Sequence, residues 1–219
     1  METREQYLEN LKSLKKEIMK MGVLVEEALG KAMKALTEQD TDLAKRIIED
    51  DEEINKMEIE IEDRCIALIA TEQPVAGDLR HVITGMKIIT QLERMGDHAV
   101  HIAKATLHID GKPYNKPLTD IPKMGEICML MNREVLSAFM DDDAVKASDL
   151  AEMDDDVDKL HEKVQRELFT GMVKNEAFLP QALQLTYISR YLERYADHIT
   201  NISEWIIYGN TGNHIDLNC

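Results

Sequence analysis

Four pairs of oxygen-bearing side chains are the features of this sequence best suited to chemistry, and the two members of each pair are four residues apart. The pairs are Asp51 and Asn55, Glu93 and Asp97, Asp154 and Asp158, and Glu193 and Asp197. Residues four apart lie on one face of an α-helix. Helical bundles hold divalent or ferric ions with such oxygen donors on facing helices. The sequence therefore predicts metal ligands at these eight positions.

The acidic pairs fall on or beside apolar seams, where a bundle normally places Leu or Ile. One seam of the second predicted helix is Ile47, Ile54, Ile61 and Leu68, and Asp51 and Glu58 occupy the partner seam. Antiparallel helices bring together residues that are equidistant from their turn. The midpoint of 51–55 and 93–97 is Pro74, and that of 154–158 and 193–197 lies between Asn175 and Glu176. We therefore expect the two pairs of each half to meet, and their mutual repulsion to favour a bound cation.

Other interpretations of these residues remain open. The acids could form a solvated face of a metal-free scaffold, with Lys56 and Arg94 as counter-charges. His98 and His198 lie about 100° around the helix from the neighbouring acids, so we expect them at the surface or in hydrogen bonds between helices. His101 and His161 are possible additional ligands.

An oxidase of the di-iron carboxylate kind is an alternative from another functional class. Such bundles need Glu-x-x-His on two helices. The chain offers only Asp78-x-x-His81 and Asp158-x-x-His161, in non-equivalent places. No Gly-rich phosphate loop, nucleophile elbow or HExxH motif is found either. The residues therefore favour a non-enzymatic protein.

Six long helices must position these side chains. We predict them over residues 4–38, 41–71, 75–109, 121–139, 144–174 and 177–208. Asp40 or Thr41 caps the second helix, and Pro180 suits the first turn of the last helix. Gly111, Pro113 and Pro117 mark a linker, so we divide the chain into a first bundle (1–110), a linker (111–120) and a second bundle (121–219).

The two halves repeat one another. Residues 92–98 (LERMGDH) recur 100 positions later as LERYADH, and residues 51–57 (DEEINKM) recur 103 positions later as DDDVDKL. A duplicated three-helix unit leaves this pattern. The predicted fold is all-α, with two repeated antiparallel three-helix bundles of the spectrin-like kind.

Charge and composition narrow the possible functions. The 219 residues carry a formal net charge of −16, which argues against nucleic-acid binding and disfavours direct phosphate sensing. No apolar run is long enough to insert into a membrane, and no signal-peptide segment is visible. The three separated cysteines suit a reducing compartment. We therefore expect a cytoplasmic protein.

Several runs of the sequence resemble the PhoU family of accessory proteins of bacterial phosphate transport. They are QPVAGDLR at 73–80, LERMGDH at 92–98, ERYADHITN at 193–201 and YGNTG at 208–212. The resemblance spans essentially the whole chain and both repeats. It implies two similar three-helix bundles and a homodimer.

The resemblance also implies a cytoplasmic negative regulator of phosphate uptake and of the phosphate-starvation response. The expected partners are the ATPase subunit of the phosphate transporter and the sensor histidine kinase. The family's E(D)xxxD motifs, which can bind multinuclear metal clusters, map to the eight positions above, with Asn55 replacing an acid. The expected metal is iron or zinc, and manganese or magnesium is chemically suitable.

Overall fold

The computed structural model describes residues 2–109, 113–114 and 118–217, and its regular structure there is entirely helical. The helices are α1 (Glu2–Glu38), α2 (Thr41–Glu72), α3 (Gly77–Ile109), α4 (Asp120–Asp141), α5 (Ala144–Asp149), α6 (Ala151–Lys174) and α7 (Leu179–Thr211), with a short 3-10 turn, η1 (Glu176–Phe178), before α7. The predicted all-α class is confirmed. No helix in the described ranges is long and apolar enough to cross a membrane.

Polar caps at the turns explain several helix boundaries. The Asp40 carboxylate accepts hydrogen bonds from the backbone N–H groups of Asp42 (3.1 Å) and Leu43 (2.9 Å), which confirms the predicted cap of α2. Asp143 caps α5 in the same way. Pro180 lies in the first turn of α7, as predicted.

The predicted helix over 144–174 is not continuous, which corrects the sequence prediction. It is divided at Leu150 into α5 and α6, although the Leu150 backbone remains close to helical (φ −69°, ψ −20°). The Leu150 side chain is only 4% exposed. Leu150 is therefore a core residue at the junction of the two helices.

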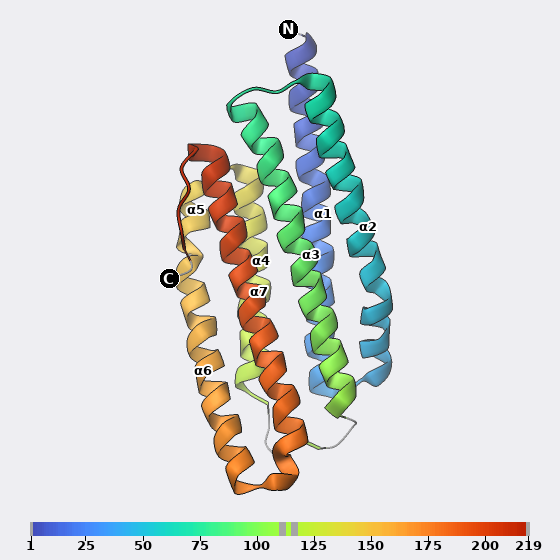
Figure 1. Ribbon diagram of the computed structural model, residues 1–219, viewed down its shortest axis with the longest axis vertical. Coiled ribbons are helices and arrows are strands. Elements are labelled where there is room, and N and C mark those ends of the chain that lie inside the picture. Colours follow the sequence, from blue (N-terminus) through green and yellow to red (C-terminus); the bar gives the residue numbers. More distant parts are fainter. Residues whose placement is uncertain (1, 110–112, 115–117, 218–219) are drawn as a thin grey trace.

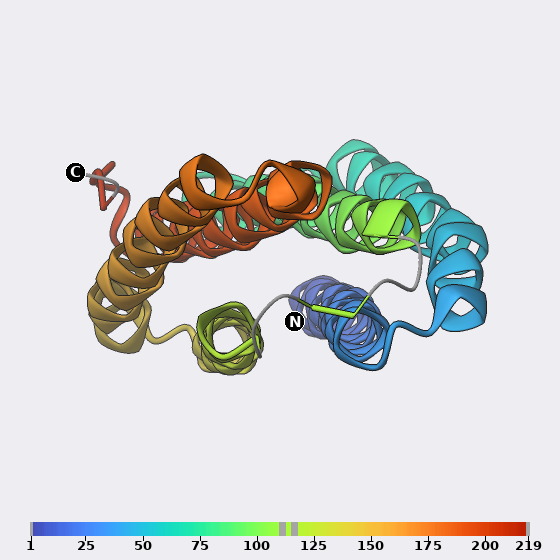
Figure 2. The ribbon, with the colours of Figure 1, turned by 90° about the horizontal axis from the view of Figure 1, so that it is seen from below.

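The helices form two layers that span both halves of the sequence. Seen end-on, α6, α7, α3 and α2 lie in a row, and α4 and α1 lie beneath them (Figure 2). The two central helices of the row, α3 and α7, come from different repeats and lie side by side (Figure 1). The motifs at 92–98 and 192–198 are therefore brought to the middle of one helical layer.

The two halves share one hydrophobic core, with buried residues from every described α-helix. Close approaches between α1 and α4 repeat with the same offset of 103 residues. A Cβ atom at Gly22 would lie 2.5 Å from Leu136, and one at Gly125 would lie 2.8 Å from Met33. These reciprocal contacts indicate that the repeats are related by a local two-fold axis. Residues 110–112 and 115–117 of the predicted linker lie outside the described residues.

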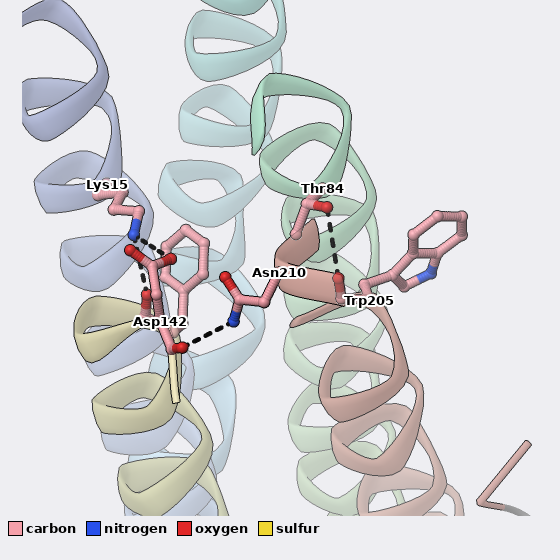
Figure 3. Close-up of polar contacts among 6 residues, drawn as sticks. Lys15, Thr84, Asp142, Trp205 and Asn210 are labelled. Carbon is pink, nitrogen blue, oxygen red and sulfur yellow. Dashed lines mark hydrogen bonds and ion pairs between the residues drawn. The ribbon is translucent and has the colours of Figure 1, made fainter. Parts of the chain in front are cut away.

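Polar contacts also join the halves at one end of the molecule (Figure 3). Lys15 on α1 donates to the Asp142 carboxylate at 2.6 Å, and Asn210 on α7 donates to the Asp142 backbone carbonyl at 2.8 Å. Thr84 on α3 donates to the carbonyl of Trp205 on α7 at 3.3 Å. Lys15 and Asn210 thus fix the turn after α4 against α1 and α7, and Thr84 joins α3 to α7.

Candidate functional site

The acidic side chains of the first half come together between α2 and α3, as the spacing predicts. Burial raises the pKa of Asp51, and the charge of Asp97 raises it further. Burial also raises the pKa of Glu93, followed by the charges of Asp97, Glu58 and Asp51. These mutual effects show that carboxylates of both helices lie within electrostatic reach of one another. We call Asp51, Asn55, Glu58, Glu93 and Asp97 the first acidic group.

Asn55 and Glu58 depart from the predicted pattern of acidic ligands, Asn55 because it is an amide and Glu58 because it was not predicted. The Asn55 side chain donates to Asp51 Oδ2 at 3.3 Å, and its own Oδ1 is buried with no hydrogen-bond partner in the described part of the chain. Glu58 was not among the eight predicted ligands, yet its charge acts on Glu93. Its position seven residues after Asp51 in the same seam was the signal for it. Glu58 restores to this group the carboxylate that Asn55 lacks.

The second half repeats this arrangement between α6 and α7. Asp154, Asp158, Glu193 and Asp197, with His161 beside Asp158, form what we call the second acidic group. Burial raises the pKa of Asp154 to about 7, and the charges of Asp158, Asp197, Asp155 and Glu193 add to the effect. His161 is 103 residues after Glu58, so the repeats place a histidine and a carboxylate in equivalent positions.

The donor chemistry of both groups suits a hard cation. They present carboxylate oxygens with raised pKa values, which is the expected effect of like charges gathered in a partly buried layer. Asp154 Oδ1 is buried and has no hydrogen-bond partner among the residues described. In the present rotamers, however, no three His, Cys, Asp or Glu side chains within the described ranges are arranged to hold a metal ion. Metal binding would therefore require rotamer changes, and the eight predicted ligands remain a prediction.

A pocket of about 390 Å³ lies between the two acidic groups, on the line where α3 meets α7. The same four positions of each repeat line it. They are Arg94, Asp97, His98 and His101 on α3, and Arg194, Asp197, His198 and Asn201 on α7. Asp97 and Asp197 thus belong both to the acidic groups and to the wall of this pocket, which we call the dyad pocket.

The histidines that line the dyad pocket belong to a cluster of stacked rings. The rings of His98 and His198 stack with centroids 5.2 Å apart, and Tyr191 stacks on His98 and on His101. The prediction that these histidines bond between helices is right for His198, whose Nδ1 lies 2.8 Å from Gln91 Oε1 on α3. For His98 it is wrong, because the ring is 9% exposed and neither nitrogen has a hydrogen-bond partner in the described part of the chain.

Burial and neighbouring cationic groups lower the pKa values of the stacked imidazoles. Burial lowers the pKa of His98 to about 3, and His198, His101 and Arg194 lower it further by charge repulsion. Burial lowers the pKa of His198 to about 4, with added repulsion from Arg94 and Arg194. Both rings are therefore neutral near pH 7, so each has one N–H donor and one acceptor nitrogen.

Other candidate residues have ordinary structural roles. Lys56 pairs with Glu60 at 3.6 Å on its own helix, and Asn201 donates to the backbone carbonyl of Asp197 at 2.9 Å. Cys65 is buried, and burial raises the pKa of its thiol to about 12. Its thiol is therefore unreactive at neutral pH. Cys219 lies outside the described residues.

A duplicated all-α scaffold with symmetry-related acidic groups defines this chain as a two-repeat helical-bundle protein. The PhoU domain family matches residues 18–106 and 121–206. The chain belongs to the PhoU family, as the sequence motifs indicate. The family consists of accessory and regulatory proteins of phosphate transport. The prediction of a non-enzymatic protein is therefore confirmed.

Similar proteins cover nearly the full length of the chain. It is 39% identical over 217 residues to the phosphate-specific transport system accessory protein PhoU homolog of Clostridium acetobutylicum, covering 99% of both chains. It is 36% identical over 203 residues to PhoU of Escherichia coli K12, covering 93% of this chain and 84% of that protein. The crystal structure of PhoU from Streptococcus pneumoniae matches with a TM-score of 0.90 and 35% identity, over 96% of this chain and 99% of that one.

Proposed function

We propose that this protein is an accessory protein of a phosphate transport system that restrains phosphate uptake and keeps the phosphate-starvation response off when phosphate is plentiful. It acts in the cytoplasm, as a homodimer, by docking on the ATPase subunit of the transporter and on the sensor histidine kinase. Its membership of the PhoU family supports the transport role. The positions of the acidic groups on exposed helices support a role in docking.

The proposal includes a metal cluster at each acidic group. The observation that carries it is the repetition of partly buried, mutually repelling carboxylates at equivalent positions of the two halves. Asp51, Asn55, Glu93 and Asp97 would hold the first cluster, with Glu58 as a further donor. Asp154, Asp158, Glu193 and Asp197 would hold the second, with His161 beside them. Bound iron, zinc, manganese or magnesium would neutralise the carboxylates and fix the rotamers of this face.

Elemental analysis of protein purified without chelator and without a nickel column tests the metal part of the proposal. We expect several metal ions per chain. The double variant Asp154→Asn/Asp158→Asn should lose about half of them, because it removes two carboxylates of one group.

The chain offers a matched control on the same helix. Glu152 and Asp156 are also four residues apart on α6, and both are exposed. The variant Glu152→Gln/Asp156→Asn should keep the full metal content. Equal metal content in all three proteins would contradict the assigned ligands. No metal in the parent protein would favour the metal-free scaffold, and oxygen consumption with ferrous iron would favour the oxidase.

Binding assays test the docking part of the proposal. We expect the purified protein to bind the transporter's ATPase subunit and the cytoplasmic part of the kinase, and to elute with a mass near 50 kDa, about twice its chain mass of 25.0 kDa. A monomer that binds neither protein, whether loaded with metal or treated with chelator, would contradict the proposed partners and the dimer.

A further inference from the structure

The dyad pocket is distinct from the acidic groups in chemistry, because it adds cationic and neutral donors to two carboxylates. Arg94 and Arg194 both line it, one from each repeat. A guanidinium group presents several N–H donors in a plane and suits bidentate contact with an oxyanion. Paired guanidinium groups across a local two-fold axis therefore favour a small, negatively charged ligand.

His98 provides an independent indication that the pocket takes a ligand. Its imidazole forms part of the pocket wall and is 9% exposed, and no described residue makes a hydrogen bond to either ring nitrogen. Buried polar groups in folded proteins are almost always hydrogen-bonded. The pocket volume of about 390 Å³ is many times the ~30 Å³ that one water occupies in the liquid. A ligand larger than water can thus enter and supply the hydrogen bonds that this ring lacks.

The carboxylates of Asp97 and Asp197 restrict which anion fits. A carboxylate accepts hydrogen bonds and repels an anion that carries no proton. Sulfate has no O–H group near neutral pH, whereas inorganic phosphate retains at least one in both of its neutral-pH ions. A phosphate monoester, with a second pKa of about 6, retains one in a minor fraction of its ions. A pocket with arginine donors and carboxylate and imidazole acceptors matches an oxyanion that is itself both an acceptor and a donor.

We infer that the dyad pocket binds a protonated tetrahedral oxyanion of the phosphate class, held by Arg94 and Arg194 and selected by its O–H group through Asp97 and Asp197. Two sources share this chemistry, free inorganic phosphate and the phosphoryl group of a nucleoside monophosphate. The biological meaning of the site rests on the proposed function, since an occupied pocket would report phosphate status between the two docking groups. The net charge of −16 is offset at this site, because Arg94 and Arg194 balance the charges of Asp97 and Asp197 in the pocket wall.

Isothermal titration calorimetry of the full chain at pH 7 tests the inference, with inorganic phosphate, sulfate and AMP as separate ligands. We expect saturable binding of one phosphate per chain and at least tenfold weaker binding of sulfate. If AMP binds more tightly than phosphate, the phosphoryl group of a nucleotide is the physiological source, and the oxyanion site stands. Sulfate binding as tight as phosphate binding, or no binding of any ligand, overturns the inference.

Arginine variants locate the site. The double variant Arg94→Gln/Arg194→Gln should weaken phosphate binding at least tenfold, because it removes two charge-assisted contacts. Both side chains are exposed, so the fold should persist, which circular dichroism would verify. Arg190→Gln is the matched control, since Arg190 is exposed on the same helix but does not line the pocket. An equal loss of binding in Arg190→Gln would contradict the location.

Elemental analysis of the same samples separates this inference from the metal proposal. If a protein that holds no metal, before and after chelator treatment, binds phosphate, the oxyanion site is supported and the metal clusters are contradicted. A metal-loaded protein that does not bind phosphate would contradict the oxyanion site and support the metal clusters. We expect the double arginine variant to keep its metal and to lose phosphate.

Discussion

Asp154 is the carboxylate of the described residues whose pKa is raised furthest. It is 9% exposed, and its pKa is raised to about 7, whereas an unfolded Asp titrates near ~3.9. The folded state therefore holds this proton more tightly than the unfolded state. The resulting stabilisation is fully present below about pH 4 and is lost as the pH rises through 7.

In metal-free protein, Asp154→Asn should therefore increase the free energy of unfolding at pH 8 by an amount on the order of a few kcal/mol and change it little at pH 4.5. Urea unfolding with chelator at both pH values measures this difference. His98 and His198, whose pKa values are lowered, affect stability in the opposite sense, but they do so equally in both proteins. Asp156→Asn, an exposed neighbour on the same helix, should give a pH-independent difference. If the change in free energy of unfolding caused by Asp154→Asn were also the same at both pH values, the raised pKa would be contradicted.

The candidate site was partly predictable from the sequence at this scale. The seam positions and the equal distances from Pro74 predicted that Asp51, Glu93 and Asp97 would lie together. They could not reveal the dyad pocket, because its two walls come from helices 100 residues apart in sequence. Helical periodicity describes one helix at a time and does not determine which helices of different repeats pack together.

At the scale of the helices, Gly22 sets the distance between α1 and α4. A Cβ atom there would lie within 2.5–3.1 Å of three atoms of Leu136, which is 1% exposed and has no room to move. We expect Gly22→Ala to lower the free energy of unfolding by about 1–2 kcal/mol, because overpacking outweighs the gain in helix propensity. Gly30→Ala on the same helix meets only Met129 Sδ at 3.4 Å. Chemical denaturation should show Gly30→Ala to be neutral or stabilising, and an equal effect of both substitutions would contradict the close approach.

The turn between α2 and α3 contains a second testable feature. Ala76 has a positive φ of 49°, a left-handed conformation that costs an L-residue roughly 1 kcal/mol or more. Ala76→Gly should therefore raise the thermal midpoint, with a gain of about 0.5–1 kcal/mol after the entropy cost of glycine. Ala70→Gly, at an exposed position inside α2, should lower stability by about 1 kcal/mol. A lowered midpoint for Ala76→Gly would show that the backbone strain is not relieved there.

Most helix boundaries could be predicted because they depend on local chemistry. Asp40 and Pro180 act within one turn of their own position. The division at Leu150 could not be predicted, because the sequence around it contains no Gly or Pro and its backbone stays close to helical. The third helix begins at Gly77 rather than at 75 because Ala76 adopts a turn conformation.

At the scale of the whole molecule, contacts between the two repeats occur in both helical layers. The Gly22–Leu136 and Gly125–Met33 contacts lie between α1 and α4, and the His98–His198 stack lies between α3 and α7. Both layers of the molecule are therefore joined across the repeat boundary. The dyad pocket and the two acidic groups consequently sit on one packed unit.

This shared packing predicts that the two halves unfold together. The hydrophobic core is continuous, so neither half can unfold without exposing apolar surface of the other. Trp205 is the single tryptophan and lies on α7, whereas far-UV circular dichroism reports on all helices. We expect coincident transitions by the two probes in urea. Gly22→Ala, a change in the first half, should shift the Trp205 transition as far as the dichroism transition, because destabilising α1 lowers the stability of the whole unit. Two separate transitions, or an unshifted Trp205 signal, would mean that the repeats are independent domains joined by the 111–120 linker.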